Sequence, residues 1–212
     1  MADKVLENNQ VNITGVVDSE FTYSHEVFGE QFYVFNISTE RISGVLDTIP
    51  VTISERAINL DEIHVGKRFK IYGQFRSFNK HMEHKNRVIL SVFARDIMEL
   101  DDNQLDVNEN YISLDGYICK EPIYRKTPLG REIADMLIAV NRSYGKSDYI
   151  PCICWGRNAR FAENFNVGGH IQVWGRIQSR EYQKKISEDE FEKRVAYEVS
   201  VSKLEYIEDE EA

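Results

Sequence analysis

The chain has 212 residues, enough for two domains of about 100 residues that each bury a core of their own. Its composition, 42% hydrophobic and 29% charged, is that of a soluble globular protein, and no apolar run approaches the ~20 residues that span a bilayer, so we expect no membrane association. The net charge of −9 counts against nucleic-acid binding by the chain as a whole, because phosphate contacts need clustered Lys and Arg.

The first expected domain, residues 1–100, opens with a segment that has no apolar core and no small-residue cleavage site, so the expected location is the cytoplasm. Five segments rich in β-branched and aromatic residues follow, a pattern typical of strands. They are Gln10–Asp18, Phe32–Thr39, Thr48–Ile53, Phe69–Phe75 and Val88–Ile97. A helix-like segment, Arg56–His64, separates the third from the fourth.

Residues 101–109 are acidic and lack hydrophobic periodicity, which predicts a linker. The second domain is expected over 110–206, with an acidic tail at 207–212. It repeats the strand pattern at Tyr111–Cys119, Ile133–Asn141, Tyr149–Trp155, Ile171–Ser179 and Val195–Leu204, with a helix at Arg157–Phe165. A long hairpin loop is expected from Lys184 to Arg194.

An internal repeat relates the two halves. A shift of 101 positions superposes glycine, proline, aromatic and charged residues, and one inserted residue extends the match at a shift of 102. The matched pairs include Gly15 with Gly116, Arg41 with Arg142, Asp47 with Asp148, Pro50 with Pro151, and Gly73 with Gly175. Five strands with a helix between the third and fourth is the OB-fold order, so the sequence predicts an all-β protein of two tandem five-stranded Greek-key barrels, each with one short helix.

The three cysteines, Cys119, Cys152 and Cys154, are odd in number, and the last two share one face of a strand, which argues against a disulfide framework. We expect them to act as small core residues. His81 and His84 have a metal-compatible spacing, but no Cys or carboxylate cluster completes a tetrahedral set. No metal site and no cofactor are therefore expected.

Aromatic residues in the second half are candidates for ligand binding, because that half is the net-positive part of the chain, with 15 basic and 12 acidic residues over 110–204. Tyr149 and Trp155 have the same parity on one strand and therefore share a face, some 20 Å apart at about 3.3 Å per residue. OB barrels bind single strands by stacking bases on such residues. Tyr144, in the preceding loop, and Tyr182, at the outer end of the fourth strand, are further candidates.

Several short motifs of the second half belong together. They are Gly116, Thr127-Pro128-Leu129-Gly130, Ala139-Val140-Asn141-Arg142, Tyr149-Ile150-Pro151, Trp155-Gly156-Arg157 and Trp174-Gly175-Arg176. Through them residues 111–204 resemble the DNA-binding domain of bacterial single-stranded DNA-binding proteins. The resemblance implies a homodimer containing four barrels and four base-stacking positions, which fall on Tyr144, Tyr149, Trp155 and Tyr182.

The two halves differ at these positions. The equivalent points of the first half are Ser43, Thr48, Ser54 and Lys80, none of which stacks on a base, so the first barrel is expected to lack the stacking residues. Aromatic character shared by both halves, as at Tyr72 and Trp174, indicates packing between barrels or subunits instead. Basic residues beside the aromatic candidates are expected to contact phosphates: Arg142, Lys146, Arg157, Arg176 and Arg180.

The sequence thus predicts a non-catalytic protein that binds single-stranded DNA in replication, repair or recombination, with replication or repair proteins as further partners. An alternative is an OB-fold interaction module of a replication, primosome or mobile-element complex with weak DNA affinity, which the net acidity favours. An enzyme is not expected, since no paired carboxylates, activated Ser or Cys, Walker loop or metal cluster is present in the sequence.

Overall fold

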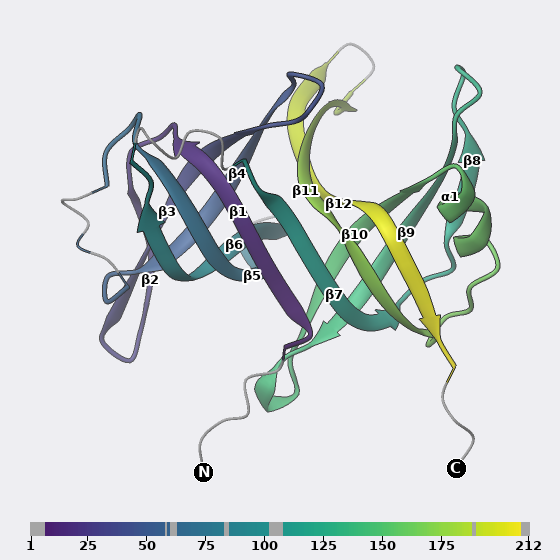
Figure 1. Cartoon of the computed structure of the whole chain (residues 1–212), viewed down its shortest axis with the longest axis horizontal. Coiled ribbons are helices and arrows are strands. Elements are labelled where there is room, and N and C mark those ends of the chain that lie inside the picture. Colours follow the sequence, from purple (N-terminus) through teal and green to yellow (C-terminus); the bar gives the residue numbers. More distant parts are fainter. Residues whose placement is uncertain are drawn as a thin grey trace.

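The computed structural model describes residues 7–57, 59, 63–82, 85–101, 108–187 and 190–208, with the backbone alone at 79–82 and 85–87. In the first half five strands close into a barrel (Figure 1). They are β1 (Asn9–Val17), β3 (Glu30–Glu40), β4 (Leu46–Ser54), β5 (Arg68–Met82) and β6 (Lys85–Glu99). Around the barrel the order is β1, β3, β4, β6, β5 and back to β1, and only β4 and β6 run parallel.

The second half closes in the same way. Its strands are β7 (Asn110–Ile118), β9 (Glu132–Asn141), β10 (Ser147–Trp155), β11 (His170–Lys185) and β12 (Phe191–Ile207). Their order is β7, β9, β10, β12, β11 and back to β7, and the parallel pair is β10 with β12. This is the topology of the OB fold in both halves, as the sequence predicts.

Four short elements complete the described part of the chain. Two extra strands, β2 (Thr22–Val27) and β8 (Ile123–Lys126), pair with β3 and β9, and the sequence analysis missed both because they are exposed on nearly every side chain. A 3-10 turn, η3 (Ser143–Gly145), precedes β10. The helix α1 (Arg157–Ala162) is shorter than expected, and among the described residues no helix is long and apolar enough to cross a membrane.

Some expectations concern residues outside this description. They are the linker residues 102–107, the end of the acidic tail at 209–212, residues 58 and 60–62 of the expected first-half helix, and the metal-spaced His84. In the second half the rings of Phe161 and Phe165 contact each other, with their centroids 4.9 Å apart. Phe165 itself lies beyond the end of α1.

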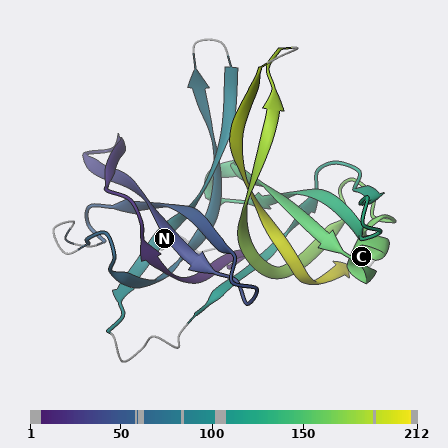
Figure 2. The ribbon, with the colours of Figure 1, turned by 90° about the horizontal axis from the view of Figure 1, so that it is seen from above.

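Each barrel extends one hairpin as an arm. The expected long loop between Lys184 and Arg194 is wrong, because β11 continues to Lys185 and β12 begins at Phe191. Cross-strand charge pairs support this arm, such as Lys193 Nζ and Glu181 at 2.6 Å, and they do not show as hydrophobic alternation. The β5–β6 arm runs to Met82, and both arms project beyond the barrels on the same side (Figure 2).

The arms begin at bulges that glycines allow. The register shifts between Tyr72 and Gly73 in β5 and between Trp174 and Gly175 in β11. A Cβ at either glycine would collide with a carbonyl oxygen of the facing strand, that of Phe93 or of Ser200. The matched glycines of the repeat therefore mark where each strand bends from barrel into arm.

The two barrels are joined by backbone pairing as well as by the connecting segment. Strand β1 pairs antiparallel with β7, so the hydrogen-bonded sheet runs through both halves although each half closes on itself. Val11 lies opposite Ile112, its own counterpart at the repeat shift of 101. A local two-fold relation between the barrels follows from this self-pairing.

Each barrel has an apolar interior built from alternate residues of its strands. Ile13, Phe35 and Phe69 are fully buried in the first half, and Ile112 and Ile138 in the second. Cys152 and Cys154 are also buried, which confirms their expected role as core residues, whereas the same expectation is wrong for Cys119, which is only partly buried. Burial raises the pKa of the Cys154 thiol to about 12. The outward-facing positions of the same strands remain for binding.

Candidate nucleic-acid interface

The outer face of β10 carries the central pair of candidate residues. Ile150, Cys152 and Cys154 point into the core, and the alternate residues point outward. Tyr149 is 51% exposed and Trp155 is 39% exposed, at opposite ends of this face. The alternation along β10 therefore places both aromatic side chains on one outer surface, with Pro151 and the covered Ile153 between them.

Trp155 is held by a neighbouring strand. Its indole Nε1 donates a hydrogen bond to Ser200 Oγ on β12, at 3.3 Å. Ser200 in turn lies opposite Arg176 on β11. The outer face therefore continues from β10 across β12 to β11. The sequence analysis missed Ser200, and only the Trp155–Ser200 contact across the parallel pair reveals its role.

The outward residues of β11 extend this surface into the arm. Arg180 and Tyr182 lie two positions apart on the same face, and the Arg180 guanidinium carbon is 5.9 Å from the Tyr182 ring centre. Between them and Trp155 lies a buried acid, Glu198, which accepts a hydrogen bond from Gln178 at 2.8 Å and lies 3.5 Å from Arg180. The face is therefore aromatic and basic, with one carboxylate at its centre.

The other candidates flank β10. Tyr144 is 84% exposed in the loop before the strand, where its backbone has a positive φ of 63°. Lys146 follows it and is exposed. At the far end Arg157 opens α1 and is exposed as well. The structure thus places an aromatic and a basic residue at each end of β10.

Arg142 makes a structural contact. Its guanidinium forms an ion pair with the buried Asp148 and donates a hydrogen bond to the carbonyl oxygen of Ser77, in the first barrel, at 2.7 Å. The backbone N–H of Ser77 donates to Asp148 Oδ1 at 2.5 Å. We name these three residues the Asp148 clamp. It fastens the first-barrel arm to the start of β10.

The repeat produces a second copy of this arrangement. Arg41 pairs with the buried Asp47 and donates to the carbonyl oxygen of Ser179, whose own N–H donates to Asp47 Oδ1 at 2.7 Å. Hydrogen bonding to Asp47 raises the pKa of Arg41. We name Arg41, Asp47 and Ser179 the Asp47 clamp. Each barrel therefore grips the arm of the other, which explains why Arg and Asp recur in the repeat.

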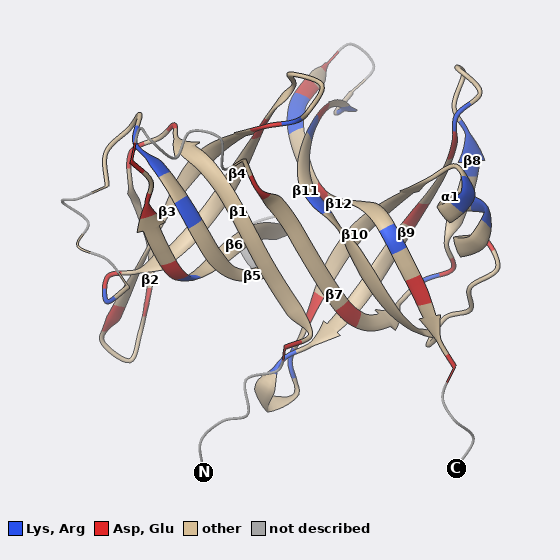
Figure 3. Cartoon of the chain, viewed as in Figure 1, with Lys and Arg blue, Asp and Glu red and all other residues tan. Residues whose placement is uncertain are grey.

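The clamps also reach the candidate binding residues. The backbone N–H of Tyr149 donates to Ser77 Oγ at 2.8 Å, so the first barrel helps to position an aromatic residue of the second. Arg176 lies 3.6 Å from Asp47, and burial lowers its pKa. Among the five basic candidates Lys146, Arg157 and Arg180 are thus the ones turned most fully to solvent. Figure 3 shows Lys and Arg beside α1 and along the β11–β12 arm, interspersed with acids.

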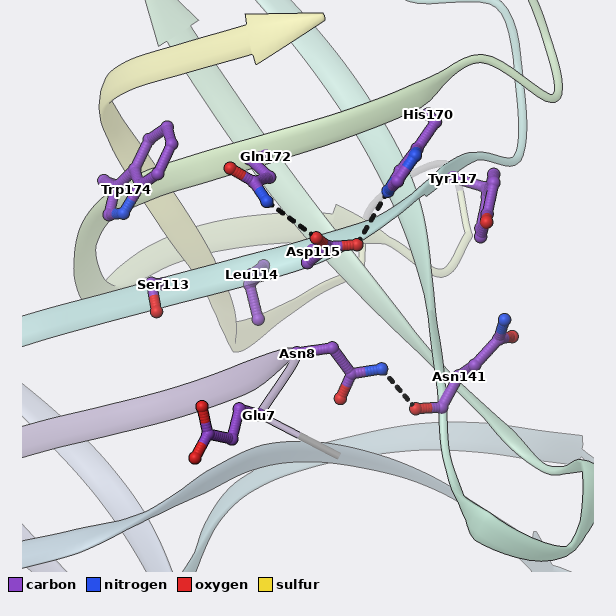
Figure 4. A pocket seen from close by; sticks show the side chains of 10 residues that line it. All are labelled: Glu7, Asn8, Ser113, Leu114, Asp115, Tyr117, Asn141, His170, Gln172 and Trp174. Atoms are coloured by element: carbon purple, nitrogen blue, oxygen red, sulfur yellow. Dashed lines mark hydrogen bonds and ion pairs between the residues drawn. The ribbon is translucent and has the colours of Figure 1, made fainter. Parts of the chain in front are cut away.

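Trp174 occupies a different environment. It lines a pocket of about 480 Å³ beside the β1–β7 junction, together with Asn8 and Ser113 (Figure 4). In this pocket Asp115 accepts hydrogen bonds from Gln172 and lies 2.8 Å from His170 Nε2. The Lys203 ammonium lies 4.4 Å from the Trp174 ring centre. Its neighbours are therefore polar residues near the inter-barrel junction, and Trp155 and Trp174 contact different sets of residues.

Comparison with known proteins agrees with this geometry. Residues 109–207 match the model of the single-strand binding protein family. Single-stranded DNA-binding protein 2 of Listeria innocua is 37% identical over 81 residues, 35% of this chain and 51% of that protein. Single-stranded DNA-binding protein A of Bacillus subtilis is 35% identical over 83 residues, 36% of this chain and 48% of its own length. The chain spans about half the length of these curated relatives.

Solved structures extend the likeness to both halves. A deletion mutant and the wild type of the single-stranded DNA binding protein from Thermus aquaticus superpose with TM-scores of 0.77 and 0.74. Each comparison covers 96% of this chain and at least 95% of the other, at 19% and 21% identity, which shows a shared fold. With the family match over the second barrel, these findings identify residues 109–207 as a domain of the single-strand binding protein family, in a chain that has the fold of two tandem OB barrels.

Proposed function

We propose that the chain binds single-stranded DNA without catalysis and protects single strands during replication, repair or recombination. The observation that carries the proposal is the exposure of Tyr149 and Trp155 at the two ends of one outward strand face. Tyr144 and Tyr182 extend that face on either side. The names of the Listeria and Bacillus relatives support the same activity.

The chemistry follows from the side chains. Bases stack on the four aromatic residues, each stack contributing about 1–3 kcal/mol without preference for sequence. Lys146, Arg157 and Arg180 contact phosphates directly. Arg142 and Arg176 already face Asp148 and Asp47, so they add positive potential more than direct contacts. The Glu198 carboxylate limits the net charge of the face.

The wider setting is part of the proposal. The chain divides into a first OB domain at 1–100, a linker at 101–109, the DNA-binding OB domain at 110–206 and an acidic tail at 207–212. Two copies form a homodimer with four barrels, which works in the cytoplasm away from membranes. Replication or repair proteins are its further partners. Trp174 and Tyr72 serve packing between barrels or subunits.

A direct test is the affinity of the purified full chain for labelled oligo-dT over a series of salt concentrations. The proposal predicts binding that weakens as salt rises, because phosphate contacts release counterions. Single-stranded competitor should displace the oligonucleotide, and duplex of the same length should not. Binding of duplex and single strand with equal affinity would contradict base stacking.

The alternative function is an assembly module with weak DNA affinity. The specific observations in its favour are the net charge of −9 and the ion pairing of Arg142 and Arg176 with acids of the clamps. The same titration separates the two functions. No measurable oligo-dT binding even at low salt would favour the module.

A further inference from the structure

The first barrel has a groove at the place where the second barrel presents its candidate face. The cavity has a volume of about 740 Å³ and lies between β2 and the outer faces of β5 and β6. The described residues that line it are Thr22, Tyr23, Ser24, His25, Val34, Thr52, Arg76, Phe78, Ile89, Ser91, Phe93 and Arg142. None of these is acidic, in a chain with a net charge of −9.

Aromatic rings and the guanidinium groups of Arg76 and Arg142 line the groove. Phe78 is 41% exposed, and His25 is exposed with its ring stacked on Phe32 at 4.9 Å between centroids. The Arg76 guanidinium carbon lies 3.8 Å from the centre of the Phe93 ring. Flat apolar faces therefore lie beside a cation, which is the combination that binds a base and its phosphate.

The aromatic positions of the two barrels are exchanged between neighbouring strands. The parallel pairs align Val92 with Val51 and Val199 with Cys152, so Phe93 is the spatial equivalent of Ser200. In the second barrel Trp155 contacts Ser200, whereas in the first barrel Ser54 replaces the Trp and Phe93 replaces the Ser. Aligning the two halves at one constant offset in sequence therefore does not reveal that Phe93 is the aromatic residue at this place in the first barrel.

The arm shows the same kind of exchange. On β5, Arg76 and Phe78 occupy the places of Gln178 and Arg180 on β11, since Arg76 faces Ser91 as Gln178 faces Glu198. The first barrel consequently has Ser91 where the second has the buried Glu198. One aromatic and one basic residue remain on the arm, and the central carboxylate is absent from this face.

The positive charge of Arg76 has no carboxylate paired with it among the described residues. Arg76 is partly buried, and it donates hydrogen bonds to the neutral Gln74 Oε1 at 2.8 and 3.2 Å. No ion pair joins it to a carboxylate within the described residues. Burial lowers its pKa to about 10; the charges of Arg142 and Arg95 act in the same direction, and the Asp148 carboxylate acts in the opposite direction. An anion bound in the groove would stabilise the positive charge of Arg76.

We propose that the groove is a second site for single-stranded nucleic acid, in which bases stack on Phe78 and His25 and a phosphate faces Arg76. The inference rests on the proposed function, because it extends the same ligand from the second barrel onto the first. Two contacts connect the sites: Arg142 lines the groove, and Tyr149 N–H donates to Ser77 on the arm. One strand can therefore pass from Tyr149 into the groove.

The test uses the full chain and an oligo-dT of about 30 nucleotides, longer than the 4–16 that one OB barrel covers. Phe78→Ala removes an exposed ring from the groove, and Phe28→Ala is the matched control, since Phe28 is fully exposed in the β2–β3 turn outside it. The expected result is an affinity about fivefold or more below the control for Phe78→Ala, the lower bound for one stack.

Photochemical cross-linking of the wild-type chain to the same oligonucleotide carrying 5-iododeoxyuridine locates the strand directly. Adducts in peptides that contain His25, Phe78 or Phe93, beside adducts around Trp155, are expected. Adducts confined to the second barrel, with Phe78→Ala equal to Phe28→Ala, would overturn the inference and leave the proposed function standing. Absence of both binding and adducts would remove the proposed function itself.

Discussion

Replacing Trp155 by Ala tests the assignment of the binding face. In the proposed function the indole provides one base stack, so its loss should weaken oligo-dT binding by about 1–3 kcal/mol, or roughly 5- to 150-fold. Trp155 also donates one hydrogen bond to Ser200, a contact worth about 1 kcal/mol. For a chain of this size such a loss lowers Tm by only about 2–4 °C. The loss of binding free energy should therefore equal or exceed the loss of unfolding free energy.

Fluorescence anisotropy of labelled oligo-dT measures the affinity, and thermal unfolding measures Tm. Trp174→Ala is the matched control, because it removes the chain's other indole from the polar pocket beside the β1–β7 junction. We expect near-normal binding by the control, and a change in its Tm or oligomer equilibrium. The dependence of affinity on salt should be unchanged in Trp155→Ala, since no phosphate contact is lost. Normal binding by Trp155→Ala with weak binding by Trp174→Ala would show that the wrong face is assigned.

Three further predictions concern charge and packing. Asp148→Asn should lower the unfolding free energy by about 3 kcal/mol, and Tm by about 6–12 °C, because Arg142 loses its partner. The control Asp135→Asn changes an exposed ion pair and should alter Tm little, so equal Tm values for the two variants would contradict the clamp. The double change of Lys146 and Arg157 to Gln should reduce the slope of log affinity against log salt by about 1.4, at about 0.7 for each phosphate contact on a single strand, and an unaltered slope would exclude both as phosphate contacts. Alkylation of the native chain, followed by mass spectrometry, should modify Cys119 well before Cys154, whose pKa burial raises to about 12; equal rates would show that the second core is open.

Much of the fold could be predicted because the repeat and the alternation of hydrophobic residues depend on which residues lie inside each barrel. Glycines such as Gly15 and Gly116 lie where another strand passes close to the backbone, and the five barrel strands of each half alternate between core and solvent. Strands β2 and β8 bury almost no side chain, so they leave no such pattern. The length of the β11–β12 arm was missed for a similar reason, since a cross-strand charge pair supports it and leaves no hydrophobic pattern.

The candidate site could be predicted only in part. Tyr149 and Trp155 are an even number of positions apart on β10, which was enough to place them on one face. The alternation of side chains along a strand depends on that strand alone. The partners of Arg142 depend on the arm of the other barrel, which approaches through contacts between residues 65 positions apart. The recurrence of Arg, Asp and Ser in both halves was the available signal, and it indicates the two clamps. The groove of the first barrel was hidden because its aromatic residues lie on different strands from those of the second.

The most direct test of the central claim uses the two tryptophans as reporters. In the Trp174→Phe variant Trp155 is the remaining indole, and its fluorescence can be followed as oligo-dT is added. Stacking of a base on Trp155 predicts strong quenching that saturates with the same affinity as anisotropy reports, and that is absent from Trp155→Phe. Saturable binding by Trp174→Phe without a change in Trp155 fluorescence would contradict the account.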